Sequence, residues 1–328
     1  MQMRLLVVRL AIVAALVPPL ASCALYDRVL ANKTIKEAHT FYQRGDFQRA
    51  SEGYEEVLAA ASAEVVAADA NLTPVYFYLG NSYDNLYRPG RRGEPENDAL
   101  LERAIQNYEL AAQTLTHDPP LRRLSMQYLF AAYGPDKLND PNRGEPVLQR
   151  MIDVDPGDVE NYFALARLYE DAGEYELAEE TLLKVKGSSP DDVLVYMQLD
   201  AFYTRIGEFD KSMEALQERA TREPNNPEAF YTISTRYWEK AFRDFRLGEE
   251  EKRQHIMSGL EAADKAIALK DDYAEALTYK NILLRLQANM EKDLDVQKRL
   301  ISQADELRDR AEELIKQRTA AAAAPAAQ

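Results

Sequence analysis

The chain has 328 residues, with 40 Lys and Arg against 55 Asp and Glu, which gives a formal net charge of −15. A surface of this sign repels phosphate backbones, so the composition argues against a nucleic-acid-binding protein. Cys23 is the single cysteine, which excludes an intrachain disulfide and a paired-cysteine redox site.

The first 22 residues have the pattern of a secretory signal peptide. Arg4 and Arg9 lie near the N-terminus, and an apolar run from Leu10 to Val17 follows them. That run is far shorter than the roughly 20 residues that a membrane-spanning helix needs, so it predicts a cleaved signal rather than a permanent span. An ordinary signal peptide with an incidental cysteine is the alternative that the pattern leaves open.

The run Leu20-Ala21-Ser22-Cys23 resembles the lipobox of bacterial lipoproteins. The resemblance implies that residues 1–22 are removed and that Cys23 is lipidated as the new N-terminus. Cleavage would leave 38 basic against 55 acidic residues, a formal charge of −17. Cys23 is followed by Ala24 and not by aspartate. In a Gram-negative cell, the resemblance therefore implies that the protein is anchored at the periplasmic face of the outer membrane. We therefore expect a lipid-anchored protein of the cell envelope, with residues 23–30 as its tether.

Three segments beginning near residues 159, 193 and 227 align at an offset of 34 residues. Apolar residues recur at intervals of three and four, which predicts amphipathic helices. Gly173 and Gly207 end the first helix of a pair, where a positive φ is needed, and Pro190 and Pro224 end the second. The other matched residues are Tyr162, Leu165, Ala166, Tyr169, Tyr175, Ala178 and Leu182; then Tyr196, Leu199, Asp200, Tyr203, Phe209, Ser212 and Leu216; then Phe230, Ile233, Ser234 and Tyr237.

This pattern resembles the tetratricopeptide repeat (TPR), a helix-turn-helix unit of 34 residues. Altered copies extend the resemblance to roughly 31–290. The resemblance implies an all-α, right-handed superhelical solenoid of six or seven TPR units, with insertions near 88–97 and 244–253. We expect a capping helix at 291–318 and a disordered Ala/Pro tail at 319–328.

In TPR proteins, defined positions of the first helix of each repeat face a concave groove. Mapped onto this chain, those positions are rich in aromatic residues, which suit a bound peptide or helix. Packing within the protein is the alternative at each position, and Trp238 in particular has the option of packing beneath the second insertion. The predicted partner-binding residues are Tyr42, Phe77, Asn81, Asp84, Phe163, Arg167, Met197, Tyr231, Thr235 and Trp238, with Ile35, His39, Glu170 and Thr204 at further groove positions.

Signatures of catalysis do not emerge from the sequence. His39, His117 and His255 lie far apart, and the chain has no HExxH motif, glycine-rich phosphate loop or G-x-S-x-G elbow. The acidic run 153–158 fails as a calcium loop because its twelfth position is Ala164. We therefore expect no enzyme, no metal, no cofactor and no small-molecule substrate.

The function that these features favour is a membrane-anchored scaffold that binds an envelope protein or peptide in its groove. Three alternatives stay open: an assembly lipoprotein of a type IV pilus or outer-membrane insertion machine, an envelope enzyme with its site in the insertions, and a structural spacer whose concave face is filled by its own side chains. The basic stretch Gly90–Gly93 is either a contact for an acidic partner or lipid head group, or a flexible loop.

Overall fold

The computed structural model describes residues 19–323, with side chains from residue 29 to residue 321, and every element in that range is helical. The predicted all-α class is confirmed. The helices are α1 (Pro19–Gln43), α2 (Phe47–Ala60), α3 (Ala63–Ala68), α4 (Val75–Leu86), η1 (Pro89–Arg91), α5 (Pro95–Thr114), α6 (Pro119–Tyr133), α7 (Pro141–Val154), α8 (Val159–Asp171), α9 (Tyr175–Ser188), α10 (Val193–Ile206), α11 (Phe209–Arg222), α12 (Pro227–Arg243), α13 (Glu249–Leu269), α14 (Ala274–Met290) and α15 (Leu294–Ala323).

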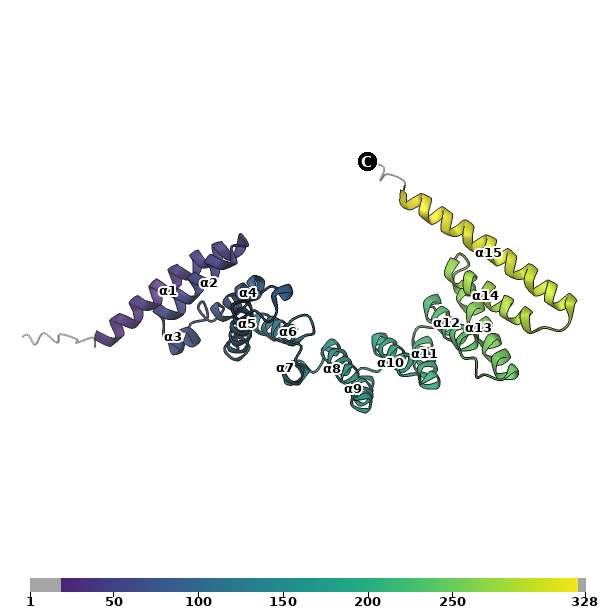
Figure 1. The fold of residues 1–328 in the computed structure, drawn as a ribbon, viewed down its shortest axis with the longest axis horizontal. Coiled ribbons are helices and arrows are strands. Elements are labelled where there is room, and N and C mark those ends of the chain that lie inside the picture. Colours follow the sequence, from purple (N-terminus) through teal and green to yellow (C-terminus); the bar gives the residue numbers. More distant parts are fainter. Residues whose placement is uncertain (1–18, 324–328) are drawn as a thin grey trace, which may run out of the picture. The chain divides into compact units, whose positions relative to one another are not determined.

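Apart from the short α3, the α-helices follow one another as seven helix–turn–helix pairs (Figure 1). Four of the turns contain a glycine in the left-handed region: φ is 75° at Gly45, 94° at Gly93, 80° at Gly173 and 83° at Gly207. A side chain with a Cβ rarely adopts this conformation, so glycine allows the first helix to end and the second to begin within a few residues. The turns predicted at Gly173 and Gly207 are therefore present.

Three segments differ from their predicted description. The predicted tether, 23–30, is part of α1, and residues 1–18 of the predicted signal peptide lie outside the described residues. Residues 319–323, predicted to be disordered, continue α15, as expected of a run of alanines with high helix propensity. Residues 324–328 lie outside the described range. The second insertion is a five-residue turn, 244–248, followed by the long helix α13.

The chain divides into two compact units, Met1–Asn161 and Tyr162–Gln328, with the boundary inside α8. In the first unit, Gly53 of α2 lies so close to α1 that a Cβ at this position would be 2.8 Å from that of Ala38. The connection from α2 to α4, residues 61–74, is long and contains α3. The fully buried core of the first unit includes Tyr54, Leu72, Tyr108, Leu115, Met126, Leu129 and Leu148.

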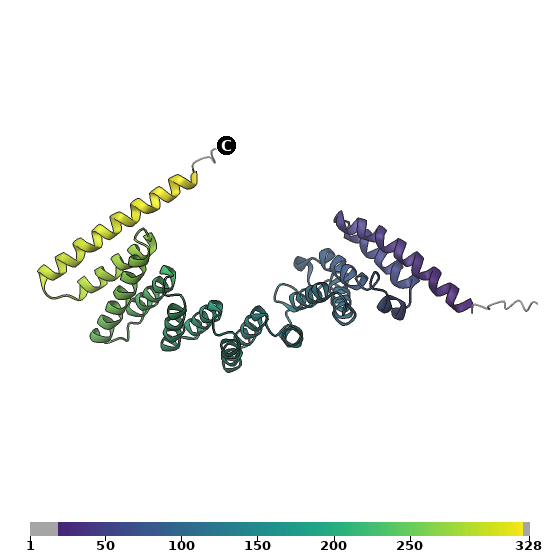
Figure 2. The same ribbon diagram turned by 180° about the vertical axis from the view of Figure 1, so that it is seen from behind.

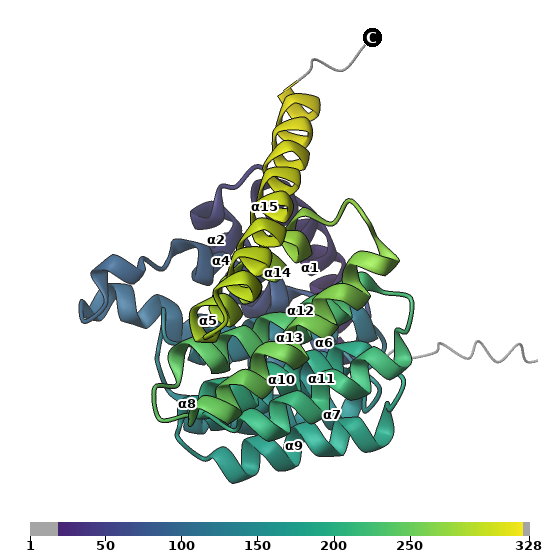
Figure 3. The ribbon, with the colours of Figure 1, turned by 90° about the vertical axis from the view of Figure 1, so that its right-hand side faces the viewer.

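The second unit has an apolar core shared by its successive helices. Met213 and Leu216 of α11 pack with Ala229 and Ile233 of α12 and with Ala262 of α13. Figures 2 and 3 show the long helix α15, in yellow, beside α14.

Two small residues on α15 and two ion pairs join it to α14. Ala304 and Ala311 are buried. Arg285 binds Asp305 at 2.5 Å, and Arg318 binds Glu275 at 3.1 Å. The small side chains let the two helices approach closely, and the ion pairs fix their alignment.

Candidate functional site

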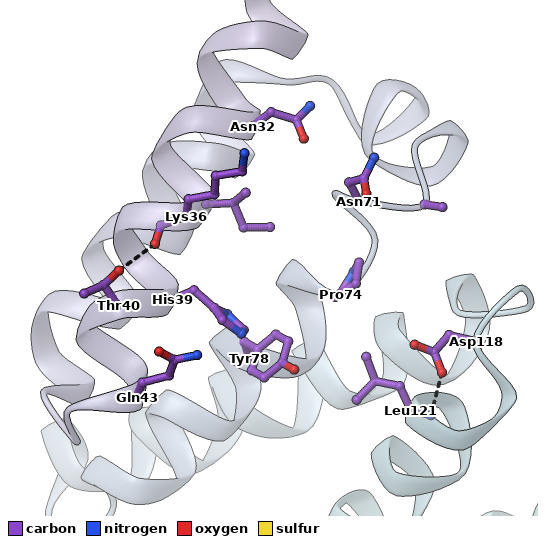
Figure 4. A pocket seen from close by; sticks show the side chains of 12 residues that line it. Asn32, Lys36, His39, Thr40, Gln43, Asn71, Pro74, Tyr78, Asp118 and Leu121 are labelled. Carbon is purple, nitrogen blue, oxygen red and sulfur yellow. Dashed lines mark hydrogen bonds between the residues drawn. The ribbon is translucent and has the colours of Figure 1, made fainter.

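An open hollow of about 610 Å³ lies among α1, the segment before α4 and the start of α6 in the first unit. Figure 4 shows side chains from these three regions surrounding it. We call this hollow the groove. It is lined by Asn32, Ile35, Lys36, His39, Thr40, Gln43, Ala70, Asn71, Pro74, Tyr78, Asp118 and Leu121.

Helical spacing explains how one helix forms an entire wall of the groove. The lining residues of α1 recur at intervals of three and four, from Asn32 to Gln43, so they share one face. The opposite wall begins where the Asp118 carboxylate accepts a hydrogen bond from the backbone N–H of Leu121 at 3.1 Å. That bond caps α6 at its N-terminus and holds Leu121 at the rim.

The floor of the groove is aromatic. The rings of His39 and Tyr78 meet edge to face, with centroids 4.3 Å apart. His39 Nδ1 also lies 2.9 Å from the hydroxyl oxygen of the fully buried Tyr54. Burial lowers the pKa of His39 below its usual value of 6.5, so this ring is neutral at neutral pH. The floor therefore presents an uncharged surface.

The four residues predicted to line a groove in this unit lie behind the floor or within the core. Phe77 and Asn81 are each 4% exposed. The Tyr42 hydroxyl donates to Asn81 Oδ1 at 2.7 Å, and Asp84 accepts from the Tyr108 hydroxyl at 3.1 Å and from Lys137. The expected contact of Phe77, Asn81 and Asp84 with a partner is therefore corrected: the Phe77 ring is buried, and the polar atoms of Asn81 and Asp84 join neighbouring helices.

In the second unit the predicted residues are divided between core and surface. Phe163 is buried, whereas Met197 is 39% exposed. Arg167 forms ion pairs with Glu170 at 3.5 Å and with Asp171 at 3.0 Å. Thr235 donates to the backbone oxygen of Thr232 at 2.7 Å. These side chains do not form one surface with a common chemistry.

Tyr231 and Trp238 of α12 pack against α14. The Tyr231 ring lies 5.3 Å from that of Tyr273 and 5.5 Å from that of Tyr279, and the Trp238 ring lies 5.3 Å from that of Tyr279. Trp238 also packs on the buried cluster that contains Leu283. The alternative in which the aromatic residues are packing residues is the better description of this helix.

The basic stretch near residue 90 is bound to the protein itself. Arg91 Nε donates to Glu94 at 2.9 Å, and Arg92 donates to the backbone oxygen of Leu138 at 2.8 Å. These contacts do not fit the predicted flexible loop.

An enzyme site in the insertions calls for a pair of carboxylates with perturbed pKa values in a pocket. In the second insertion, hydrogen bonds from Arg246 and Lys240 lower the pKa of Asp244, and these contacts are ion pairs of a helix end. No three His, Cys, Asp or Glu residues in the described part of the chain gather closely enough to hold a metal ion. Among residues 19–323, none of the helices is both long enough and apolar enough to cross a bilayer.

Sequence reasoning found Ile35 and His39 but missed Tyr78, Leu121 and the lining residues between α3 and α4. The signal for the first wall was present, because Asn32, Lys36 and Gln43 continue the helical spacing of Ile35 and His39. The segment 69–74 carries no repeat signature, so its part in the groove was not readable from the 34-residue pattern.

Residues 137–201 match the family model of the tetratricopeptide repeat. None of the curated proteins matches the chain significantly. Among solved structures, the chain is similar to the C-terminal part of a TPR repeat-containing protein from Cytophaga hutchinsonii, at 14% identity over 86% of this chain and 98% of that chain, with a TM-score of 0.52.

Two further similarities have lower TM-scores. A tetratricopeptide repeat protein from Parabacteroides merdae has 13% identity over 84% of this chain and 98% of that chain, with a TM-score of 0.42. Residues 41 to the end of MamA from Desulfovibrio magneticus have 15% identity over 60% of this chain and 96% of that chain, with a TM-score of 0.40. With the helix pairs, the similarity to the Cytophaga structure shows an all-α fold of TPR-like helix pairs, and the family match itself is confined to residues 137–201.

Proposed function

We propose that this protein is a non-catalytic scaffold that holds a polypeptide segment of another protein in the groove of its first unit. The observation that carries the proposal is an open hollow, about 610 Å³ in volume, lined by α1, by the segment before α4 together with Tyr78, and by the start of α6. Helix-paired repeats expose such surfaces, and a groove of this kind accepts an extended or helical segment.

The chemistry of the groove favours a segment that inserts an apolar side chain and surrounds it with polar groups. Ile35, Tyr78 and Leu121 supply apolar contact, while Lys36 and Gln43 are exposed at the rim. Apolar contact provides most of the binding free energy, and polar groups at the edge fix the register of the segment.

We also propose that the scaffold is held to a membrane of the bacterial envelope by lipid on Cys23. The support is the lipobox resemblance at Leu20–Cys23. Helix α1 is continuous from Pro19 to Gln43, so Asn32, at the near end of the groove, lies about 14 Å along the helix axis from residue 23. A partner in the groove would then be close to the membrane surface.

Site-specific photo-cross-linking in membranes tests groove binding. A photoreactive amino acid is placed at Lys36, which lines the groove, and at Lys33, an exposed residue of the same helix that does not. We expect a discrete cross-linked protein from position 36 and none from position 33, with the yield reduced by Leu121→Ser. Equal products from both positions, or a yield that Leu121→Ser leaves unchanged, would contradict groove binding.

The identity of the cross-linked protein separates the two assembly alternatives, a pilus component or an outer-membrane assembly component. Absence of any product from position 36 would favour the spacer alternative.

The anchor is tested separately by Cys23→Ser. We expect this variant to leave the membrane fraction while its far-ultraviolet circular dichroism stays the same, because the anchor and the packed helices are independent. Retention in membranes would show that lipid on Cys23 is not the anchor.

A further inference from the structure

The turn between α12 and α13 in the second unit forms the edge of another hollow, about 450 Å³ in volume. We call this hollow the turn site. Its lining residues come from the α10–α11 turn, the last turns of α12 and the α12–α13 turn: Thr204, Gly207, Phe209, Ser212, Arg236, Glu239, Lys240, Arg243, Asp244, Phe245 and Arg246.

An aromatic side chain stands almost fully in solvent at the rim of the turn site. Phe245, which lines the hollow, is 94% exposed. A large apolar side chain exposed to this degree beside a hollow is typical of contact surfaces, because covering it releases ordered water.

The rim also carries an excess of cations in a strongly acidic chain. The rim carries Lys240, Arg243 and Arg246. Asp244 binds Lys240 at 3.0 Å and Arg246 at 3.0 and 3.1 Å, whereas the other lining carboxylate, Glu239, binds Arg236 of the inner wall. No acceptor for Arg243 is present among the described residues. The Arg246 side chain is 80% exposed. Two positive charges therefore remain at the rim for an anionic ligand, although the whole chain has a net charge of −15.

The inner wall of the turn site is fixed by bonds within the protein. Arg236 binds both carboxylate oxygens of the buried Asp200, at 3.0 and 2.9 Å, and also binds Glu239 at 2.9 Å. The Ser212 hydroxyl donates to Asp200 at 2.7 Å. Because these inner groups are already paired, the capacity for an anion is confined to the rim.

Three glutamates, Glu249 to Glu251, begin α13 just beyond the turn but do not line the hollow. Glu251 accepts from the backbone N–H of Gly248 at 3.0 Å, and Glu249 accepts from Arg253 at 3.3 Å. They cap and stabilise the helix start, and they would repel an extended anionic surface such as a bilayer of acidic lipids.

We propose that the turn site binds an acidic polypeptide segment that carries an aromatic or aliphatic side chain. The carboxylates of the segment pair with Arg243 and Arg246, and its apolar side chain packs on Phe245 and on the Phe209 ring below Lys240. Planar guanidinium groups suit this role because they bind carboxylates with two parallel hydrogen bonds. The turn site belongs to the second unit and the groove to the first, so the chain has a second binding surface of different chemistry.

Fluorescence anisotropy with the full chain carrying Cys23→Ser tests the proposal. The probe is a short fluorescein-labelled peptide of Asp, Glu and one Phe, and its control is the same peptide with Asn and Gln in place of the acids. We expect saturable binding of the acidic peptide only. The double variant Arg243→Gln/Arg246→Gln should weaken it by about tenfold or more, because two charge-assisted contacts are lost.

Matched variants separate the turn site from general surface effects. Phe245→Ser should weaken binding by about threefold to tenfold, through lost apolar contact. Arg299→Gln and Met257→Ser, which alter exposed residues of the same unit outside the hollow, should change it by less than about twofold. Asp244→Asn keeps an oxygen that accepts from the Arg246 backbone N–H but removes the competing charge, so it should strengthen binding about threefold.

Strengthening by Asp244→Asn cannot arise from unfolding, so it supports the proposal independently of the loss variants. The proposal is overturned if the acidic peptide does not bind, if the amide peptide binds equally well, or if Asp244→Asn weakens binding. It is also overturned if vesicles of phosphatidylglycerol and phosphatidylcholine bind the chain through Phe245 while the peptide does not, which would identify a lipid surface.

Discussion

The aromatic faces of the first helices have different surroundings in the two units. In the first unit, His39 and Tyr78 form the floor of an open groove. In the second, Tyr231 and Trp238 are covered by Tyr279 of the next repeat. Aromatic residues of first helices therefore line an open hollow in one unit and pack against the next repeat in the other.

Connection length accounts for the difference. The connection before α4 comprises residues 61–74 and includes α3, whereas the connection before α14 comprises residues 270–273 alone. A short connection keeps the next first helix close enough for its rings to cover those of α12. A long connection such as 61–74 places wall residues beside α1 and leaves the aromatic face of α1 uncovered.

A contact between successive repeats is common to both units. The Tyr83 hydroxyl donates to Glu55, whose carboxylate also lies 3.7 Å from Arg103. In the second unit, the Tyr203 hydroxyl donates to Glu179 at 2.8 Å, and Lys211 binds the same carboxylate at 2.7 Å. The units thus differ in their exposed faces but are joined internally by the same tyrosine–glutamate–cation arrangement.

Trp238→Ala is expected to have the largest effect, because it removes a ring that packs on the core of the second unit. The free energy of unfolding should fall by about 3 kcal/mol, as for other large-to-small substitutions in a core. Urea denaturation followed by far-ultraviolet circular dichroism measures it. Phe242→Ala, at a residue 60% exposed, is the control and should cost less than about 1 kcal/mol. Equal small losses would mean that α12 presents an open face after all.

Tyr83→Phe and Tyr203→Phe test the shared contact between repeats. Each substitution removes one hydroxyl hydrogen bond to a carboxylate and should lower the free energy of unfolding by about 1 to 2 kcal/mol. The same denaturation experiment compares them. A loss in one unit only would show that the arrangement stabilises that unit alone.

The contribution of Tyr83 should depend on pH. Burial, followed by the hydrogen bond to Glu55, raises the pKa of Tyr83 from 10.0 to about 12. Because the folded-state pKa is above the unfolded one, this stability is fully present below pH 10 and is lost as the pH rises from 10 to about 12. The difference in unfolding free energy between the native chain and Tyr83→Phe should shrink over that interval. If this difference in unfolding free energy stayed constant with pH, the neutral Tyr83 hydroxyl would not be the group that provides the stability.

Gln43→Ala is expected to have the smallest effect on stability. Gln43 is exposed at the rim of the groove, so the free energy of unfolding should change by less than about 0.5 kcal/mol. Thermal denaturation checks this value. A larger loss of unfolding free energy would show that Gln43 is part of the packed structure and that the groove of the first unit is not open at this rim.

Helix pairing was predictable wherever the 34-residue pattern is regular. Gly173 and Gly207 indicate the turns because a positive φ favours glycine in any context, and both turns are present at these residues. Local signals were also sufficient for the first wall of the groove, where the spacing of Ile35 and His39 along one helix sets their common face.

The rest depends on contacts between distant parts of the chain. Asp84 was placed at a groove position, but Lys137, which lies 53 residues later, neutralises it and helps cover it. Tyr42 and Asn81 are likewise joined across 39 residues. A position rule derived from one repeat does not contain such partners, and the long connection before α4 has no repeat register from which to predict them.

Helix α15 has a consequence for crowding. Its inner face packs on α14 through Ala304 and Ala311, and at the edge of that face Arg308 lies between the partly exposed Ile301 and Ile315. A further helix that packed on these two isoleucines would have to bury that guanidinium group, which already binds Asp305 and Asp309. We therefore expect this edge of α15 to disfavour contact with a second helix when copies of the chain are crowded together.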